Sequence, residues 1–306
     1  MSLFLNKKYE LRSGWKFATC AVFYLLIWFA TGMALSILVT GSERTESQLT
    51  ILALNEIALF VPAVAAMRLT VRFLDHRPLQ AFGVGFLPRW PRDLLSGLGL
   101  ACGMLAVLIA GCYIFGIVSM RWTGRQVPAG TLIGTFSLLL LAAVTEELVF
   151  RGFPLQLLME GMGEWPGIIG MSAFFGAIHL KNPNASLLGA INTAVAGVLL
   201  SLAYVRTRSL WLPYGIHAGW NVGLGFVFGF PLSGWDMASL WTTGIAGRDA
   251  ILGGDYGPEG GLLATFVFAA SAVIVERRRY GPVDSTQTVI GSRARRDHRN
   301  RAGDSG

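Results

Sequence analysis

At its centre the chain reads Ala142-Ala143-Val144-Thr145-Glu146-Glu147-Leu148-Val149-Phe150-Arg151. This stretch lies inside a run that is otherwise apolar from Leu132 to Leu158. A charged side chain at the centre of a bilayer costs about 2.5–3.5 kcal/mol on insertion scales, so three such groups in six residues need a reason to be there. They either carry out chemistry or only hold helices together.

The spacing of these three charges separates their roles. Glu147 and Arg151 are four residues apart, which places them on one face of a helix with the acid before the base, the favourable order for an ion pair. Glu146 points about 100° away from that pair and has no partner within the segment. The stretch therefore predicts one neutralised carboxylate and one that is free for chemistry.

The composition indicates a polytopic membrane protein. Of the 306 residues, 53% are hydrophobic and only 14% are charged, whereas soluble domains carry about 25% charged residues. The three cysteines all lie in apolar runs without metal-ligand spacing, so we interpret them as small hydrophobic residues. The first apolar stretch, residues 15–39, follows a basic N-terminus and is predicted to be a retained signal anchor.

The hydrophobic pattern predicts an all-α bundle of about eight transmembrane helices. A spanning helix needs about 20 apolar residues, with some latitude for tilt. Residues 231–260 are rich in glycine and are predicted to form a loop, with an interfacial piece around residues 235–241. The predicted spans are residues 15–39, 49–68, 93–120, 131–159, 167–180, 185–205, 210–230 and 261–275.

The distribution of positive charge orients this bundle. Nineteen of the 25 Lys and Arg residues lie in the N-terminal segment, the even-numbered loops and the C-terminal tail, and five lie on the other side. Because basic loops remain in the cytoplasm, both termini are predicted to be cytoplasmic. This layout suits a bacterial inner (plasma) membrane, and it would suit an endoplasmic reticulum as well.

The chain divides into two parts on this interpretation. Residues 1–280 are predicted to form the integral membrane bundle. Residues 281–306 are polar and basic without apolar periodicity, and they are predicted to be a disordered cytoplasmic tail. We expect this tail to lie against anionic lipid head groups of the bilayer rather than to bind nucleic acid.

Two of the four histidines fall inside apolar segments. His179 follows Phe175 by four residues, so the phenyl ring packs beside the imidazole, and His217 precedes Asn221 by four, so an imidazole and a carboxamide share a helix face. A single histidine within the membrane often only forms a hydrogen bond that helps to pack the helices. Here two histidines, an Asn, a free Glu and an Arg lie on three helices. These polar groups find hydrogen-bonding partners only if the three helices bring them together, which predicts a polar site within the membrane.

Such a cluster supports two kinds of hydrolysis. In the first, Glu146 is the general base and His179 helps to hold a water. His217 and Asn221 then donate hydrogen bonds to the oxyanion, and each donor in such sites is worth about 3–4 kcal/mol. In the second, Glu146, His179 and His217 bind a divalent metal such as zinc, which activates the water. Neither His-Glu-x-x-His nor Gly-x-Ser-x-Gly is present, so the spacing alone indicates neither a zinc nor a serine enzyme.

Three short motifs occur in order on separate hydrophobic segments. Residues 146–151 match Glu-Glu-x-x-x-Arg, residues 175–179 match Phe-x-x-x-His, and residues 217–221 match His-x-x-x-Asn. Together they resemble the CPBP (Abi) family of intramembrane proteases. That family includes the type II CAAX prenyl endopeptidases and bacteriocin-processing or immunity proteins. The resemblance covers about residues 131–230.

The resemblance implies a helical bundle of about eight spans around a polar cavity, with its protease core at about residues 131–230. It implies that Glu146 is the catalytic carboxylate, that His179 shares the activated water, and that His217 and Asn221 line the oxyanion site. Glu147 and Arg151 would be mainly structural, with Phe175 in support.

The activity implied by the resemblance is hydrolysis of a peptide bond in a peptide or protein at the membrane, as in CAAX-type processing or a related peptide maturation. Members of the family are named metalloproteases, but a glutamate mechanism without a metal is the one we favour. The alternative is a non-enzymatic transporter or chaperone-like immunity protein that uses the same polar cluster for protons or a ligand.

Overall fold

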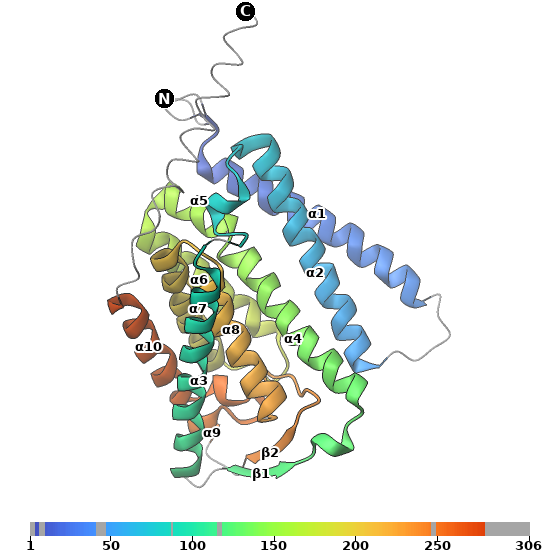
Figure 1. Ribbon diagram of the computed structural model, residues 1–306. Helices are drawn as coiled ribbons and strands as arrows, with labels where there is room; N and C mark the ends of the chain where they lie inside the picture. The colour runs from blue at the N-terminus through green and yellow to red at the C-terminus, as the bar shows by residue number, and fades with distance from the viewer. Residues whose placement is uncertain are drawn as a thin grey trace, which may run out of the picture.

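A computed structural model of the chain describes residues 4–5, 10–40, 47–86, 88–114, 118–245 and 249–278. The tail predicted over residues 281–306 lies outside these residues. The described chain is a bundle of helices with one small pair of strands at one end (Figure 1). The helices are α1 (Ser13–Thr40), α2 (Gln48–Thr70), α3 (Trp90–Ile114), α4 (Ala129–Phe150), α5 (Phe153–Met162), α6 (Glu164–Ile178), α7 (Leu187–Thr207), α8 (Trp211–Asn221), α9 (Asp249–Leu252) and α10 (Leu262–Arg277).

Each of the eight predicted segments contains at least one helix, and the all-α polytopic membrane bundle is confirmed. Within the described residues, five helical stretches are long and apolar enough to cross a membrane. They are Ser13–Ile37, Gln48–Asp75, Trp90–Ile114, Ala129–Met162 and Leu187–Thr207. The helices α6, α8 and α10 are shorter, with 15, 11 and 16 residues.

Local sequence explains where several helices begin. The hydroxyl of Ser47 accepts a hydrogen bond from the backbone N–H of Thr50 at the start of α2, and Ser186 does the same for Gly189 at the start of α7. Serine is a preferred N-cap because its oxygen satisfies a backbone donor that the first helical turn leaves unpaired.

The single helix predicted over residues 131–159 is wrong, because the chain breaks between α4 and α5. Gly152 has φ −65° and ψ −126°, outside the helical region, and Pro154 stands in the first turn of α5. Proline lacks a backbone N–H and suits that position. The break lets α5 bury Phe153 and Leu155 in the core, and it places Arg151 at the end of α4.

The third predicted helix also ends early, at Ile114 rather than at residue 120. Strand β1 (Val118–Trp122) pairs antiparallel with β2 (Trp241–Ile245), from Val118 opposite Ile245 to Trp122 opposite Trp241. The two tryptophan rings meet edge to face at 5.4 Å, a favourable cross-strand pair. The predicted loop over residues 231–260 therefore contains a strand, the short helix α9 and two 3-10 turns.

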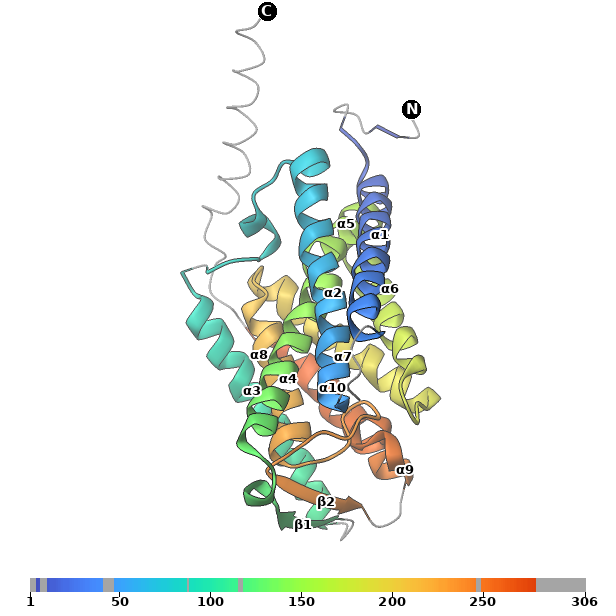
Figure 2. The ribbon, with the colours of Figure 1, turned by 90° about the vertical axis from the view of Figure 1, so that its right-hand side faces the viewer.

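Glycines bring α8 against α3 in the interior of the bundle. A Cβ added at Gly97 would lie 2.5 Å from the carbonyl oxygen of Leu212 and 2.9 Å from the Cα of Gly215, so the two backbones touch. Small residues permit this close approach in membrane helices. Figures 1 and 2 show α1 beside α2 at the edge of the bundle, whereas α8 lies among α3, α4 and α7.

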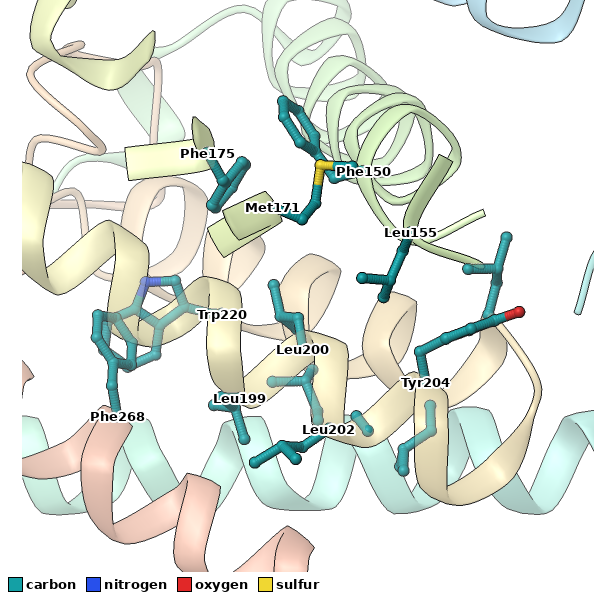
Figure 3. Packing of buried hydrophobic residues seen from close by; sticks show 14 of the residues in the cluster. Phe150, Leu155, Met171, Phe175, Leu199, Leu200, Leu202, Tyr204, Trp220 and Phe268 are labelled. Carbon is teal, nitrogen blue, oxygen red and sulfur yellow. The ribbon is translucent and has the colours of Figure 1, made fainter. Parts of the chain in front are cut away.

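An apolar core joins the helices around α8. Phe150 and Phe175 meet edge to face at 4.8 Å, and Trp220 packs on Phe268 at 5.0 Å. Figure 3 shows these residues in one region with Met171 and leucines of α7. The segments that carry the three motifs are thus held against one another by packing.

Candidate active site

The four side chains predicted to act in catalysis line one cavity. Its volume is about 320 Å³. The residues that line it come from α2, α3, α4, α6, α7, α8 and α10, from the turn after α6, and from the glycine-rich connection before α10. Glu146, His179, His217 and Asn221 are all among the lining residues. The structure therefore brings together the groups that the sequence places on separate segments.

Glu147 and Arg151 form a buried ion pair at the end of α4. Nη1 of Arg151 lies 3.2 Å from Oε1 of Glu147, and both side chains are 1% exposed. Nη2 of Arg151 donates to the backbone carbonyl of Gly197 on α7 at 3.4 Å. The guanidinium carbon also lies 4.3 Å from the centre of the Phe175 ring, within the range of a cation–π contact. This pair therefore ties α4 to α6 and α7.

Glu147 also contacts His217, which the spacing within one helix did not indicate. Nδ1 of His217 lies 2.8 Å from the same oxygen, Oε1, that faces Arg151. When Nδ1 carries the proton it donates to this carboxylate, which fixes the plane of the ring and directs Nε2 towards the cavity.

Glu146 is the carboxylate that faces the cavity. Its side chain is 32% exposed, and its Oε2 lies 3.6 Å from Nε2 of His217. This oxygen makes no hydrogen bond to any residue that the structure describes. Glu146 therefore stands next to an imidazole but remains able to bind a water or a substrate.

His179 is held by its own helix. It caps α6 and opens the 3-10 turn η4 (His179–Lys181), and its Nδ1 lies 2.7 Å from the carbonyl oxygen of Phe175. The ring of Phe175 lies 4.7 Å from that of His179 and 6.4 Å from that of His217. Phe175 thus separates the two histidines and supports both.

Asn221 ends α8, one turn after His217, and is 8% exposed. The next residues form the π-helix η5 (Val222–Val227). Widened turns of this kind are frequent at functional sites. The carboxamide and the imidazole therefore face the same cavity from one helix.

The three metal ligands that the sequence suggests, Glu146, His179 and His217, fit the geometry of a metal site poorly. The described residues contain no group of three or more His, Cys, Asp and Glu side chains arranged to hold a metal ion. Glu146, His179 and His217 therefore do not form a three-ligand cluster among the residues that the structure describes.

Two further acids, which the sequence analysis did not single out, also line the cavity. Glu56 of α2 is 8% exposed, and its Oε1 has no hydrogen-bond partner in the described part of the chain. Glu259 lies in the 3-10 turn η7 (Pro258–Gly260) and is also 8% exposed. Glu56 is the one acid within the apolar residues 49–68. The argument that singled out Glu146, that an ionisable group in a membrane-spanning segment is a candidate functional group, therefore applies to Glu56 as well. Glu259 lies in a glycine-rich connection and gave no such signal.

The fold and the site define a polytopic helical membrane protein with a carboxylate, two imidazoles and an amide around an internal cavity. Residues 128–223 match the family described as type II CAAX prenyl endopeptidase Rce1-like. This range contains all three motifs, and the resemblance to the CPBP family is confirmed over it.

One relative in the human proteome extends this similarity. The chain is 28% identical over 207 residues to CAAX prenyl protease 2 of Homo sapiens. The alignment covers 63% of this chain and 54% of the human protein, so the chain spans about half the length of the curated relative it matches.

Proposed function

We propose that this protein is an intramembrane endopeptidase that hydrolyses a peptide bond in a peptide or protein substrate at the membrane. The observation that carries the proposal is the pair of neighbouring acids. Glu147 is neutralised by Arg151, whereas Glu146 faces the cavity 3.6 Å from His217. The similarity to CAAX prenyl protease 2 supports CAAX-type processing or a related peptide maturation as the reaction.

In the proposed reaction, Glu146 takes a proton from a water that it shares with His179. The resulting hydroxide attacks the carbonyl carbon of the scissile bond, and the carbonyl oxygen becomes an oxyanion. When the intermediate collapses, the C–N bond breaks and Glu146 returns the proton to the leaving amine. The products are a carboxylic acid and an amine, and no other reactant is needed.

His217 and Asn221 stabilise the oxyanion in this scheme. For this role His217 carries both ring protons, with Nδ1 donating to Glu147 and Nε2 donating to the oxyanion. The Asn221 carboxamide supplies the second donor. Donors fixed before the reaction stabilise the developing charge without reorganising, which is why such groups usually make the largest single contribution.

The decisive experiment is cleavage of a quenched peptide library by the purified protein, with and without a chelator. We expect cleavage that survives chelation and a kcat that falls by about 10²–10⁴-fold in Glu146→Gln and in His179→Ala. Glu164→Gln, which neutralises an exposed acid at the start of α6, is the matched control and should cleave normally.

One outcome would reject the glutamate mechanism, and another would reject the proteolytic activity itself. Cleavage lost on chelation and restored by zinc would replace the glutamate mechanism with a metal-dependent one. Absence of cleavage, together with proton-coupled transport that Glu146→Gln abolishes, would instead favour the transporter alternative.

We propose that the protein lies in a bacterial inner membrane with both termini on the cytoplasmic side. The uneven distribution of Lys and Arg between the two sides of the predicted bundle favours this orientation. The basic residues of the C-terminal tail then face anionic head groups. Labelling of single cysteines placed at the two termini, in intact cells and in lysed cells, tests this orientation. Labelling of either terminus in intact cells by an impermeant reagent would contradict it.

A further inference from the structure

Glu259 is a buried acid whose hydrogen bonds run in two directions. Its Oε1 accepts a hydrogen bond from the indole Nε1 of Trp220 at 2.9 Å. Its Oε2 accepts from the backbone N–H of Ser233 at 2.7 Å and from the hydroxyl of Ser233 at 2.6 Å. Three donors bind this one side chain, so both of its oxygens are held in place.

The first direction leads to the oxyanion donors. Trp220 lies on α8 directly before Asn221 and three residues after His217. Its ring is buried and packs on Phe268 of α10. Because the indole is held at its ring and at its N–H, the bond to Glu259 fixes the rotation of the last turn of α8.

The second direction leads to His179. The carbonyl oxygen of Ser233 accepts a hydrogen bond from Nδ2 of Asn182 at 3.1 Å. The backbone N–H of Asn182 in turn donates to the carbonyl oxygen of His179 at 3.1 Å and ends the turn η4. Ser233 itself has φ 49°, an unusual value for a residue other than glycine. The contacts of its N–H, hydroxyl and carbonyl hold this conformation.

The backbone of Glu259 is anchored independently of its side chain. Nδ2 of Asn192 on α7 donates to the carbonyl oxygens of Glu259 at 2.8 Å and Gly261 at 2.9 Å. The hydroxyl of Thr265 on α10 donates to Oδ1 of Asn192 at 2.6 Å. The carboxylate therefore extends from a fixed point, which allows it to position what it binds.

We infer that Glu259 is a positioning residue that fixes the position of His179 relative to His217 and Asn221. One carboxylate connects the turn that carries the first histidine to the helix that carries the oxyanion donors, through Ser233 and Asn182 on one side and Trp220 on the other. The inference rests on the proposed hydrolysis and adds a residue outside the segment of residues 128–223 that matches the family.

Glu259→Ala, Glu259→Gln and Trp220→Phe test this role, because Phe keeps an aromatic ring but lacks the N–H. A misplacement of about 1 Å at a reacting group can cost about 10²-fold in rate. We expect kcat to fall by about that factor in Glu259→Ala, with KM within about twofold of wild type because the substrate contacts remain. Gln keeps only one acceptor oxygen, so its loss should be smaller.

The double variant of Glu259→Ala and Trp220→Phe separates positioning from general destabilisation. Since both changes remove the same bond, the double variant should lose no more kcat than Glu259→Ala alone. The control is Glu276→Ala, which removes an acid of α10 that pairs with Arg206 at the surface. It should leave kcat and KM unchanged.

A spectroscopic readout keeps the test independent of activity. The indole N–H resonance of Trp220, identified by its loss in Trp220→Phe, should shift in Glu259→Gln and stay in place in Glu276→Ala. If the wild type cleaves and Glu259→Ala matches Glu276→Ala in kcat, or if the two losses are additive, the positioning role is wrong. If the wild type cleaves nothing, the proposed hydrolysis is wrong, while an unshifted indole resonance would reject the bond itself.

Discussion

Nδ1 of His217 lies 2.8 Å from Oε1 of Glu147, and Nη1 of Arg151 lies 3.2 Å from that same oxygen. The buried ion pair of α4 is therefore also the group that orients an imidazole of α8. The two adjacent acids consequently have different surroundings. Glu147 contacts two buried side chains, Arg151 and His217, whereas Glu146 faces the cavity.

Removing the cation from this pair should destabilise the protein. In Arg151→Met the Glu147 carboxylate stays buried and loses its arginine partner, and breaking a buried pair in this way costs about 3–5 kcal/mol. The midpoint of thermal unfolding in a single detergent measures the effect. Arg206→Met removes the exposed partner of Glu276 and should change the stability by no more than about 1 kcal/mol. Equal midpoints for the two variants would show that the buried pair contributes nothing.

Truncating the amide of Asn221 should slow the chemical step. Loss of one oxyanion donor reduces kcat by about 10²–10³-fold in comparable sites, so Asn221→Ala should show this loss with KM little changed. Asn55→Ala is the matched control, because Asn55 lines the same cavity from α2 and is exposed. A rise in KM at unchanged kcat would assign Asn221 to substrate binding instead.

The contact between α3 and α8 should tolerate no added methyl group at Gly97. A Cβ there would meet backbone atoms of α8 at 2.5–2.9 Å, whereas a Cβ at Gly99 would meet nothing within 4 Å. Overpacking of this kind typically costs about 1–3 kcal/mol. Gly97→Ala should therefore lower both the unfolding midpoint and kcat, since α8 carries His217 and Asn221. Gly99→Ala should leave both unchanged or raise the midpoint slightly. Identical behaviour of the two variants would contradict the close approach.

Periodicity and polarity in the sequence were enough to place the helices and the cavity. Each of the eight apolar segments contains at least one helix, because hydrophobic length is a local property of the chain. The meeting of Glu146, His179, His217 and Asn221 also followed, since isolated polar groups in lipid-facing segments have few alternatives.

What the sequence did not reveal depends on partners distant in the chain. The strand at residues 118–122 forms only because residues 241–245 lie beside it. The bond between Glu147 and His217 joins residues 70 positions apart, and the bond between Trp220 and Glu259 joins residues 39 positions apart. The break after Phe150 carried a local signal in Gly152 and Pro154, which the strong apolar run around it obscured.

The charges of the cavity should make the protein discriminate against acidic substrates. Glu56, Glu146 and Glu259 line it, and the described lining residues include no Lys or Arg, so the doubly protonated His217 of the proposed mechanism faces three acids. Two like charges about 10 Å apart repel by about 1.7 kcal/mol at an effective dielectric constant of about 20, which is roughly 20-fold in rate. Glu56→Gln removes one of these charges outside the proposed catalytic set. It should raise kcat/KM roughly 20-fold for a peptide with an acidic residue beside the scissile bond. The matched neutral peptide should show no such gain, and Glu164→Gln should alter neither value. An equal gain for both peptides would mean that Glu56 acts through the shape of the cavity rather than through its charge.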